Sequence, residues 1–190
     1  MMTGRYAHYW HRVPSLDEEG FRLLSESVRA LIAADPTFSS QESTEAIRGW
    51  DGTGCPVLTD ETIELNGNAM HDLHHETFTL HRDLSITDLI RNGGNNAEHL
   101  HWDYVITAKK PYDQVVVATL LFAAYYLNSG IFDIHLPGTT FAFHTTEAAP
   151  FYAMLPKVEE TLSIRGEYER ARMAQVLEWC VDKSPVLQGP

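Results

Sequence analysis

The apolar positions near the start of the chain predict an amphipathic helix over residues 15–35, because they recur with the period of a helix. Ser15 and Glu18 have the spacing of a capping box at its first turn. Asp35 precedes Pro36, and a residue before proline avoids the helical region, so we expect the helix to end there. The apolar stripe of this helix consists of Phe21, Leu24, Val28, Leu31 and Ile32.

Alternation of apolar and polar residues then predicts β-strands. The first covers residues 62–65 and stops at Asn66-Gly67, a pair typical of a tight turn. A second strand is expected over 76–81 and a third over 100–106, and two shorter strands over 131–135 and 140–144. In the third strand, one face carries Leu100, Trp102, Tyr104 and Ile106, and the other carries His101, Asp103 and Val105.

A second helix is expected to begin at Pro111, because proline fits the first turn of a helix. Residues 115–127 are apolar nearly all round, which predicts a buried helix that is too short to cross a bilayer. A final helix is expected over 167–182. This order of elements predicts an α+β fold: a mostly antiparallel sheet of about five strands, a buried central helix lying across it, and flanking N- and C-terminal helices.

Composition narrows the class of protein. The chain has 190 residues, of which 44% are hydrophobic and 21% charged, as expected for one globular domain spanning residues 1–190. Its net charge of −12 argues against binding to nucleic acid or to an anionic membrane. The first residues lack the apolar segment of a signal peptide, so we expect a soluble, cytoplasmic protein. Cys55 and Cys180 are expected to be reduced thiols.

Three motifs together resemble a known group of sequences. They are DETIELNG at residues 60–67, HETF at 75–78 and TAKKPYD at 107–113. The combination is similar to an uncharacterised group of short actinobacterial and phage proteins with an LNG…ETF…TA(R/K)KPYD pattern. The resemblance covers roughly residues 9–127 and implies a bacterial or phage origin, but no activity.

The chain departs from this group in two places. It has Val105-Ile106 where the group has Cys-Lys, so a role that needs that thiol or amine is not expected here. Residues 131–190 do not resemble the usual ending of the group. We expect them to form a lineage-specific extension packed on the same core.

The TAKKPYD motif also predicts an anion-binding site. Lys109 and Lys110 precede a helix whose first backbone N–H groups lack helical partners, and this is where phosphate or carboxylate groups bind. Tyr112 is a candidate for stacking on a ring of the ligand. The alternative is an ordinary helix start, with solvated lysines, a packed tyrosine, and Asp113 interacting favourably with the helix dipole.

Histidines supply a candidate metal site. The chain has 10 histidines, and His101 and Asp103 share one face of the third predicted strand. Together with His81 or His144 from a neighbouring strand, they would form a three-ligand site, which could activate water. The sequence contains no HExxH or CxxC motif, so the alternative is a set of solvated histidines.

The leading functional hypothesis is a small soluble binding or regulatory protein of bacterial or phage origin. It would hold an anionic small molecule or a protein partner near Lys109, Lys110 and Tyr112, and nothing identifies a cofactor. One alternative is a metal-dependent hydrolase that uses the His/Asp site. A further alternative is a structural or assembly component of a phage particle, which would form a stable oligomer through an exposed apolar patch.

Overall fold

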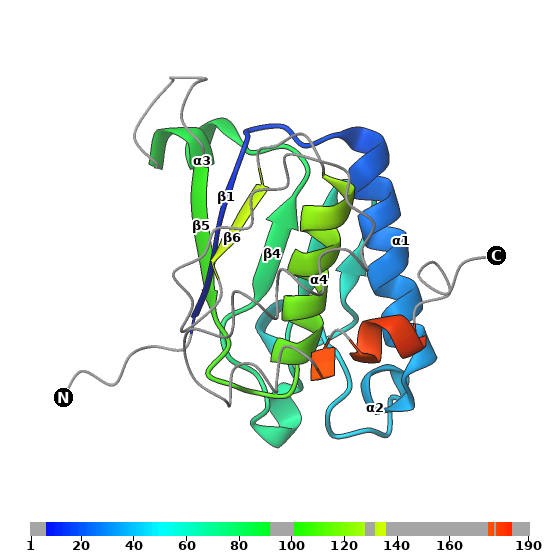
Figure 1. Ribbon diagram of the computed structural model, residues 1–190. Coiled ribbons are helices and arrows are strands. Elements are labelled where there is room, and N and C mark those ends of the chain that lie inside the picture. Colours follow the sequence, from blue (N-terminus) through cyan, green and yellow to red (C-terminus); the bar gives the residue numbers. More distant parts are fainter. Residues whose placement is uncertain (1–6, 92–100, 128–131, 136–174, 177, 184–190) are drawn as a thin grey trace, which may run out of the picture.

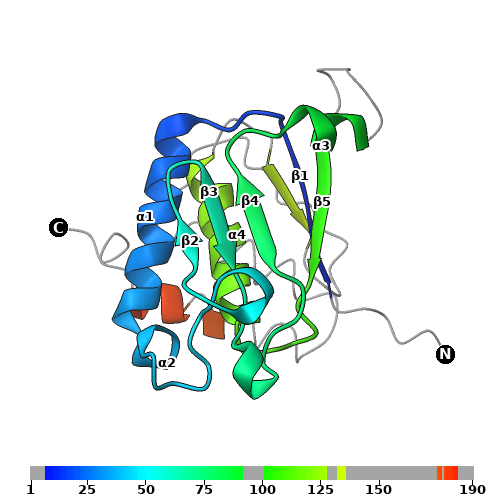
Figure 2. The ribbon, with the colours of Figure 1, turned by 180° about the vertical axis from the view of Figure 1, so that it is seen from behind.

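The computed structural model describes residues 7–91, 101–127, 132–135, 175–176 and 178–183. Helices and strands are mixed along the chain, which confirms the α+β class. Two long helices lie side by side against one face of the strands, as Figure 1 shows from the helix side and Figure 2 from the strand side. None of the described helices is long and apolar enough to cross a membrane.

The first long helix, α1, spans Glu18–Ala34 and buries the predicted apolar stripe. Its N-cap is Asp17, whose carboxylate accepts a hydrogen bond of 2.7 Å from the backbone N–H of Gly20. The predicted capping box at Ser15 is therefore wrong. Ser15 instead donates its hydroxyl hydrogen bond to Asp83 and forms an isolated β-bridge with it.

Asp35-Pro36 ends α1, as predicted, and also begins the short helix α2 (Pro36–Ser39). The described part of the C-terminal region is helical and packs against this junction. The rings of Trp179 and Phe38 lie 5.4 Å apart, and the indole N–H of Trp179 donates a hydrogen bond of 2.7 Å to Asp35. The assignment of residues 1–190 to one domain with an extension from 131 stays a prediction.

Within the described residues the strands form two three-stranded sheets, so the predicted single sheet of about five strands is not confirmed. All strand pairings among the described residues are antiparallel. One sheet has the order β5-β1-β6, with bounds His101–Ile106, Ala7–Arg12 and Phe132–His135. The other has the order β2-β3-β4, with bounds Val57–Leu58, Thr62–Leu65 and Phe78–His81. The predicted strand at 140–144 lies outside the described residues.

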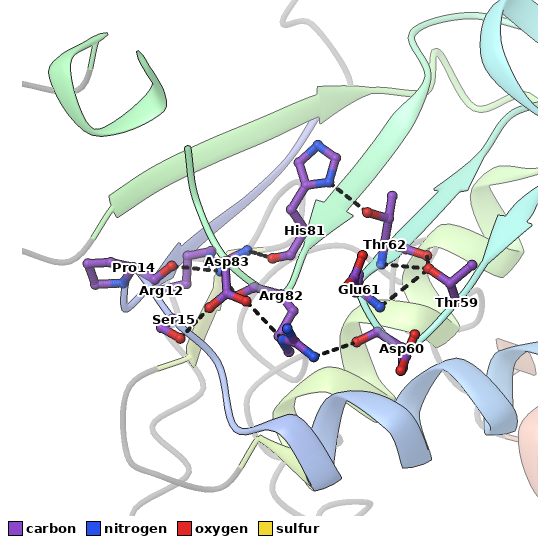
Figure 3. Close-up of polar contacts among 10 residues, drawn as sticks. All are labelled: Arg12, Pro14, Ser15, Thr59, Asp60, Glu61, Thr62, His81, Arg82 and Asp83. Atoms are coloured by element: carbon purple, nitrogen blue, oxygen red, sulfur yellow. Dashed lines mark hydrogen bonds and ion pairs between the residues drawn. The ribbon is translucent and has the colours of Figure 1, made fainter. Parts of the chain in front are cut away.

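Side chains link the two sheets where strand pairing is interrupted. The buried guanidinium of Arg12, at the end of β1, donates hydrogen bonds to the carbonyl oxygens of His81 and Arg82, the latter at 2.7 Å (Figure 3). At the opposite end, the carboxylate of Glu76 accepts a 2.8 Å hydrogen bond from the backbone N–H of Ile106. Burial lowers the pKa of Arg12 to about 10, although nearby carboxylates oppose the shift. These contacts satisfy backbone groups that a continuous sheet would pair.

Asn66-Gly67 does not form the predicted tight turn. β3 is joined to β4 by residues 66–77, which include the 3₁₀ turn η2 (Ala69–His71). The Asn66 side chain closes this connection: its amide N–H donates to the carbonyl of His75 at 3.0 Å, and its carbonyl accepts from the His75 backbone N–H at 3.1 Å. A Cβ atom on Gly67 would collide with the carbonyl oxygen of Leu73. Glycine is needed here for close backbone approach.

The third predicted strand is β5, and its buried face is the one with fewer apolar residues. His101 and Val105 are buried, whereas the Tyr104 side chain is 44% exposed. This orientation follows from the register with β1, which places Arg12 opposite His101 and His8 opposite Val105. A single strand pattern could not reveal it, because the choice of face depends on what covers the sheet.

The second long helix, α4, spans Asp113–Tyr126. Residues around its whole circumference are buried, as its uniform apolar composition predicts. It packs against α1 and β6. The remaining described elements are the 3₁₀ turn η1 (Trp50–Gly52) and the helix α3 (Ile86–Arg91).

Candidate functional site

A strained turn leads from β5 into α4, at the lower end of the molecule in Figure 1. The backbone N–H of Lys110 donates to the carbonyl of Thr107 at 3.0 Å, which closes a four-residue turn. Both central residues have positive φ, 51° at Ala108 and 59° at Lys109. This is the pattern of a type I′ turn, where glycine and asparagine are the usual residues.

Buried polar contacts hold this turn in place. Tyr112 is fully buried, and its hydroxyl donates a 2.7 Å hydrogen bond to the carbonyl of Glu76. Burial raises the pKa of this hydroxyl. Asp113, in the first turn of α4, is also fully buried. One of its carboxylate oxygens accepts hydrogen bonds from Thr107 and from His8, whose Nε2 is 2.5 Å away. The first turn of α4 thus already contains a carboxylate, that of Asp113, at the positive end of the helix dipole.

The three residues predicted to hold an anion differ in accessibility. Lys109 is exposed. The ammonium group of Lys110 donates to the carbonyl oxygen of Asp72 and lies 3.7 Å from the Asp72 carboxylate. Tyr112 has no exposed surface with which to contact a ligand. The structure therefore places all three around one turn, with Lys109 exposed, Lys110 half-buried and Tyr112 buried, and anion binding stays a prediction.

A second exposed turn, η1, lies against η2. A Cβ atom on Gly52 would come within 2.9 Å of the Ala69 Cβ, so the two turns touch. Each presents one large apolar side chain: Trp50 is 60% exposed and Met70 is 88% exposed. We call the surface formed by residues 50–52, 69–72 and 107–110 the turn end. The contact between Asp72 and Lys110 makes it continuous.

Backbone strain is concentrated at the turn end. Among the described residues, four non-glycine residues have positive φ, and all four lie there: Asp51, Asp72, Ala108 and Lys109. A left-handed conformation costs an L-residue such as Ala108 or Lys109 about 1–2 kcal/mol, and aspartate adopts it more readily. Such strain persists only where the surrounding structure imposes it, and it is often found at binding sites.

Charges of both signs surround the two apolar side chains. Asp51 is exposed, and the carboxylate-bearing side chain of Asp72 is 91% exposed. Lys109 and Lys110 supply two positive charges on the adjoining turn. The turn end is therefore close to charge balance, in a chain whose net charge is −12.

Sequence reasoning located the lysine turn but missed Trp50 and Met70. The glycines at 52 and 54, which follow Trp50, predict only a turn. The tryptophan itself could have indicated an exposed apolar side chain, because it lies in a polar turn that belongs to no predicted core element. Nothing in the sequence indicated that the turn carrying Met70 would touch the turn carrying Trp50.

The structure describes two of the three predicted metal ligands, His101 and Asp103. His101 is buried at the start of β5, and Asp103 is exposed two residues further along the same face. Partial burial raises the pKa of Asp103, although the positive charge of Arg12 opposes the shift. His144 lies outside the described residues. Within the part of the chain that the structure describes, no three His, Cys, Asp or Glu side chains are grouped to hold a metal ion.

The two cysteines differ in their exposure to solvent. Cys55 is exposed and Cys180 is buried, and both are free thiols, as predicted. Burial raises the pKa of Cys180 to about 12, which keeps that thiol protonated.

Comparisons with protein-family models, with curated proteins and with solved structures find no match. The resemblance to the actinobacterial and phage group stays a prediction.

Proposed function

We propose that this protein is a small binding protein that docks a protein partner through the turn end. The observation that carries the proposal is the exposure of Trp50 and Met70 on two adjoining turns. Tryptophan is enriched among the residues that dominate binding energy at interfaces. Methionine adapts to irregular surfaces and makes favourable contacts with aromatic rings.

A protein partner suits this surface better than a small anion. Small-molecule sites enclose most of the surface of their ligand. Here the two apolar side chains are 60% and 88% exposed, so only a partner large enough to cover both turns would bury them. Of the residues expected to contact an anion, Tyr112 is buried and Lys110 already contacts Asp72. Lys109 is exposed and supplies a positive charge at the rim of this surface.

The strained lysine turn supports a binding role for the same surface. Glycine at position 109 would adopt the observed φ of 59° without steric cost. The chain carries lysine there instead, and also carries non-glycine residues at the other three strained positions. A lysine retained against this cost is expected where its side chain contributes to binding.

Site-specific photo-crosslinking tests the proposal. A photoreactive phenylalanine derivative replaces Met70 in the full chain, which is then irradiated in extract from the source cells. We expect one predominant protein adduct. We also expect Trp50→Ala in the same chain to abolish it, because the two side chains would be covered by one partner.

The matched control places the same derivative at Ile86, which is 76% exposed but lies in α3, outside the turn end. Equal adducts at positions 70 and 86, or an adduct that survives Trp50→Ala, would refute the docking surface. Thermal shift with inorganic phosphate and with nucleotides tests the small-anion alternative. A stabilisation that is lost in Lys109→Ala would favour that alternative over a protein partner.

A further inference from the structure

The Asn66-Gly67 pair, at the start of the connection between β3 and β4, is chemically labile. Asparagine is among the residues that limit the thermal durability of proteins. It is most reactive before glycine, because glycine is the most flexible residue and has no side chain to obstruct its own backbone nitrogen. The fold nevertheless requires both residues of this pair.

The side chain of Asn66 both donates and accepts hydrogen bonds. Its amide donates to the carbonyl oxygen of His75 and to the hydroxyl oxygen of Thr77, each at 3.0 Å. Its oxygen accepts from the backbone N–H groups of Gly67 and His75, at 2.8 and 3.1 Å. An ionised aspartate can accept but cannot donate. Gly67 tolerates no side chain, because a Cβ atom there would lie 2.0 Å from the carbonyl oxygen of Leu73.

The folded structure protects this pair from reaction. Asn66 has no exposed surface, and Gly67 is also buried. The backbone N–H of Gly67 donates to the side-chain oxygen of Asn66, so this nitrogen is not free to attack the adjacent side-chain carbon. Backbone hydrogen bonds in both directions with Arg48, at 2.7 and 2.9 Å, hold Asn66 in place. The attack therefore requires residues 66–77 to open.

Once these residues open, the backbone nitrogen of Gly67 can form a bond to the side-chain carbonyl carbon of Asn66. The bond between that carbon and the side-chain nitrogen breaks, and ammonia leaves with the proton that Gly67 gives up. Water then opens the cyclic imide at either of its carbonyl groups, which yields aspartate or isoaspartate at position 66. Chemical modification of an unfolded chain makes unfolding irreversible.

We propose that Asn66 is a latent deamidation site, which is closed by the fold and reacts when residues 66–77 open, and that the product prevents this connection from closing again. Aspartate at position 66 would present an oxygen to the carbonyl oxygen of His75, to which the amide now donates. A buried carboxylate that lacks donors is costly. Isoaspartate would also add a carbon atom to the backbone. Because the same connection carries Met70, the reaction would also disrupt the turn end.

Peptide mass spectrometry of the full chain tests the protection by the fold. The chain is incubated at neutral pH in buffer and in concentrated urea, and deamidation is followed in the peptide that contains residue 66. We expect the reaction at Asn66 to be at least about tenfold slower in buffer, because it requires local opening. Asn92 precedes Gly93 and supplies the same dipeptide as a reference in urea, where both asparagines should react at similar rates.

Two results of this experiment would overturn the inference. One is an equal rate at Asn66 with and without urea, which would show that the fold does not protect it. The other is a reaction in urea that proceeds at Asn92 but not at Asn66, which would show that residue 66 is not a deamidation site.

Asn66→Asp tests the effect of the product. We expect it to lower the melting temperature by at least about 4 °C, because two buried hydrogen bonds lose their donor. Asn68→Asp is the matched control. Asn68 is also buried, but its side chain accepts a 3.1 Å hydrogen bond from the backbone N–H of Met70, and an aspartate can accept it as well. Its melting temperature should change less. An unchanged melting temperature of Asn66→Asp would contradict the second half of the proposal.

Refolding of the unaltered chain tests the same point without a substitution. After partial deamidation in urea, the chain is diluted into buffer, and the fraction that regains the native circular dichroism is separated from the fraction that does not. The native fraction should contain fewer chains modified at residue 66. Equal modification of the two fractions would show that the product does not hinder closure, and the proposed loss of the native state would be wrong.

Discussion

His8 and Asp113 lie 105 positions apart in the sequence, and their side chains meet in the interior with Nε2 of His8 2.5 Å from Oδ1 of Asp113. Both are almost completely buried. The pair joins β1 to the first turn of α4, and the hydroxyl of Thr107 donates to the same carboxylate oxygen. This contact therefore fixes the start of α4 and, through it, the strained turn that presents Lys109.

We expect Asp113→Ala to reduce the free energy of unfolding by about 3–5 kcal/mol, because it leaves His8 and Thr107 buried without their shared acceptor. Asp113→Asn keeps an oxygen acceptor and should cost less. Urea unfolding followed by circular dichroism measures both. As a surface control, Glu19→Ala removes an exposed contact with Arg22 and should change stability very little. A loss no larger than that of the control would show that the buried contact is not a determinant of stability.

The strained turn predicts a trade-off between stability and association. Lys109→Gly relieves the positive φ at that position, so we expect a gain in the free energy of unfolding of about 0.5–1 kcal/mol. The same change removes a charged contact and should weaken docking at the turn end. Thermal unfolding measures the first effect, and the yield of the photo-crosslink at position 70 measures the second.

Glu42→Gly provides the matched control, because Glu42 is exposed and is not among the residues with positive φ. Glycine there should lower stability, since it increases only the flexibility of the unfolded chain. If Lys109→Gly were destabilising to the same extent, the turn would not be strained.

Arg12 joins the two sheets by donating to carbonyl groups of residues 81 and 82. We expect Arg12→Lys to reduce the free energy of unfolding by about 2 kcal/mol, because a lysine ammonium cannot span the positions that the planar guanidinium reaches. Arg48→Lys, which changes a solvent-facing contact with Gln41, is the control and should be nearly neutral. Equal stability of the two variants would mean that other contacts hold the sheets together.

The contact between Trp179 and Asp35 predicts a pH-dependent contribution to stability. Burial alone would raise the pKa of Asp35, but hydrogen bonds from Thr37 and Trp179 outweigh it and lower the pKa. A carboxyl whose pKa is lower in the folded state stabilises the fold above its unfolded pKa, about 3.9, and loses this contribution as the pH falls through its folded value.

We therefore expect Trp179→Phe, which keeps a ring against Phe38 but removes the N–H donor, to cost about 1 kcal/mol at pH 7. The difference from the unaltered protein should shrink below about pH 4, where Asp35 becomes protonated. Urea unfolding at a series of pH values measures it. A difference that stays constant down to pH 2 would show that the hydrogen bond does not depend on the charge of Asp35.

The predicted elements that proved correct are those with a strong local pattern. The helical period of Phe21, Leu24 and Val28 predicted α1, and the apolar run after Pro111 predicted α4. The alternating strands at 62–65 and 100–106 correspond to β3 and β5. Patterns of this kind are reliable because backbone geometry sets the spacing of side chains that share a face.

The candidate site was predicted in part for the same reason. The lysines before Pro111 indicated a turn exposed at the start of a helix, and Lys109 is exposed there. Tyr112 was an exception, because its hydroxyl reaches the carbonyl of Glu76, a residue distant in the sequence. The contact with Glu76 accompanies the burial of Tyr112, and a local sequence pattern around residue 112 does not include Glu76.

The sequence by itself determined α1, α4, β3 and β5, because those choices depend on near neighbours along the chain, whereas it predicted neither β1 nor β2 nor α3. Only the tertiary structure decided that Arg12 links the two sheets, that Asn66 closes a long connection, and that the turn carrying Trp50 touches the turn carrying Met70. These arrangements depend on which distant segments satisfy each other's buried polar groups and cover each other's apolar surface, and that is settled only when the whole chain packs.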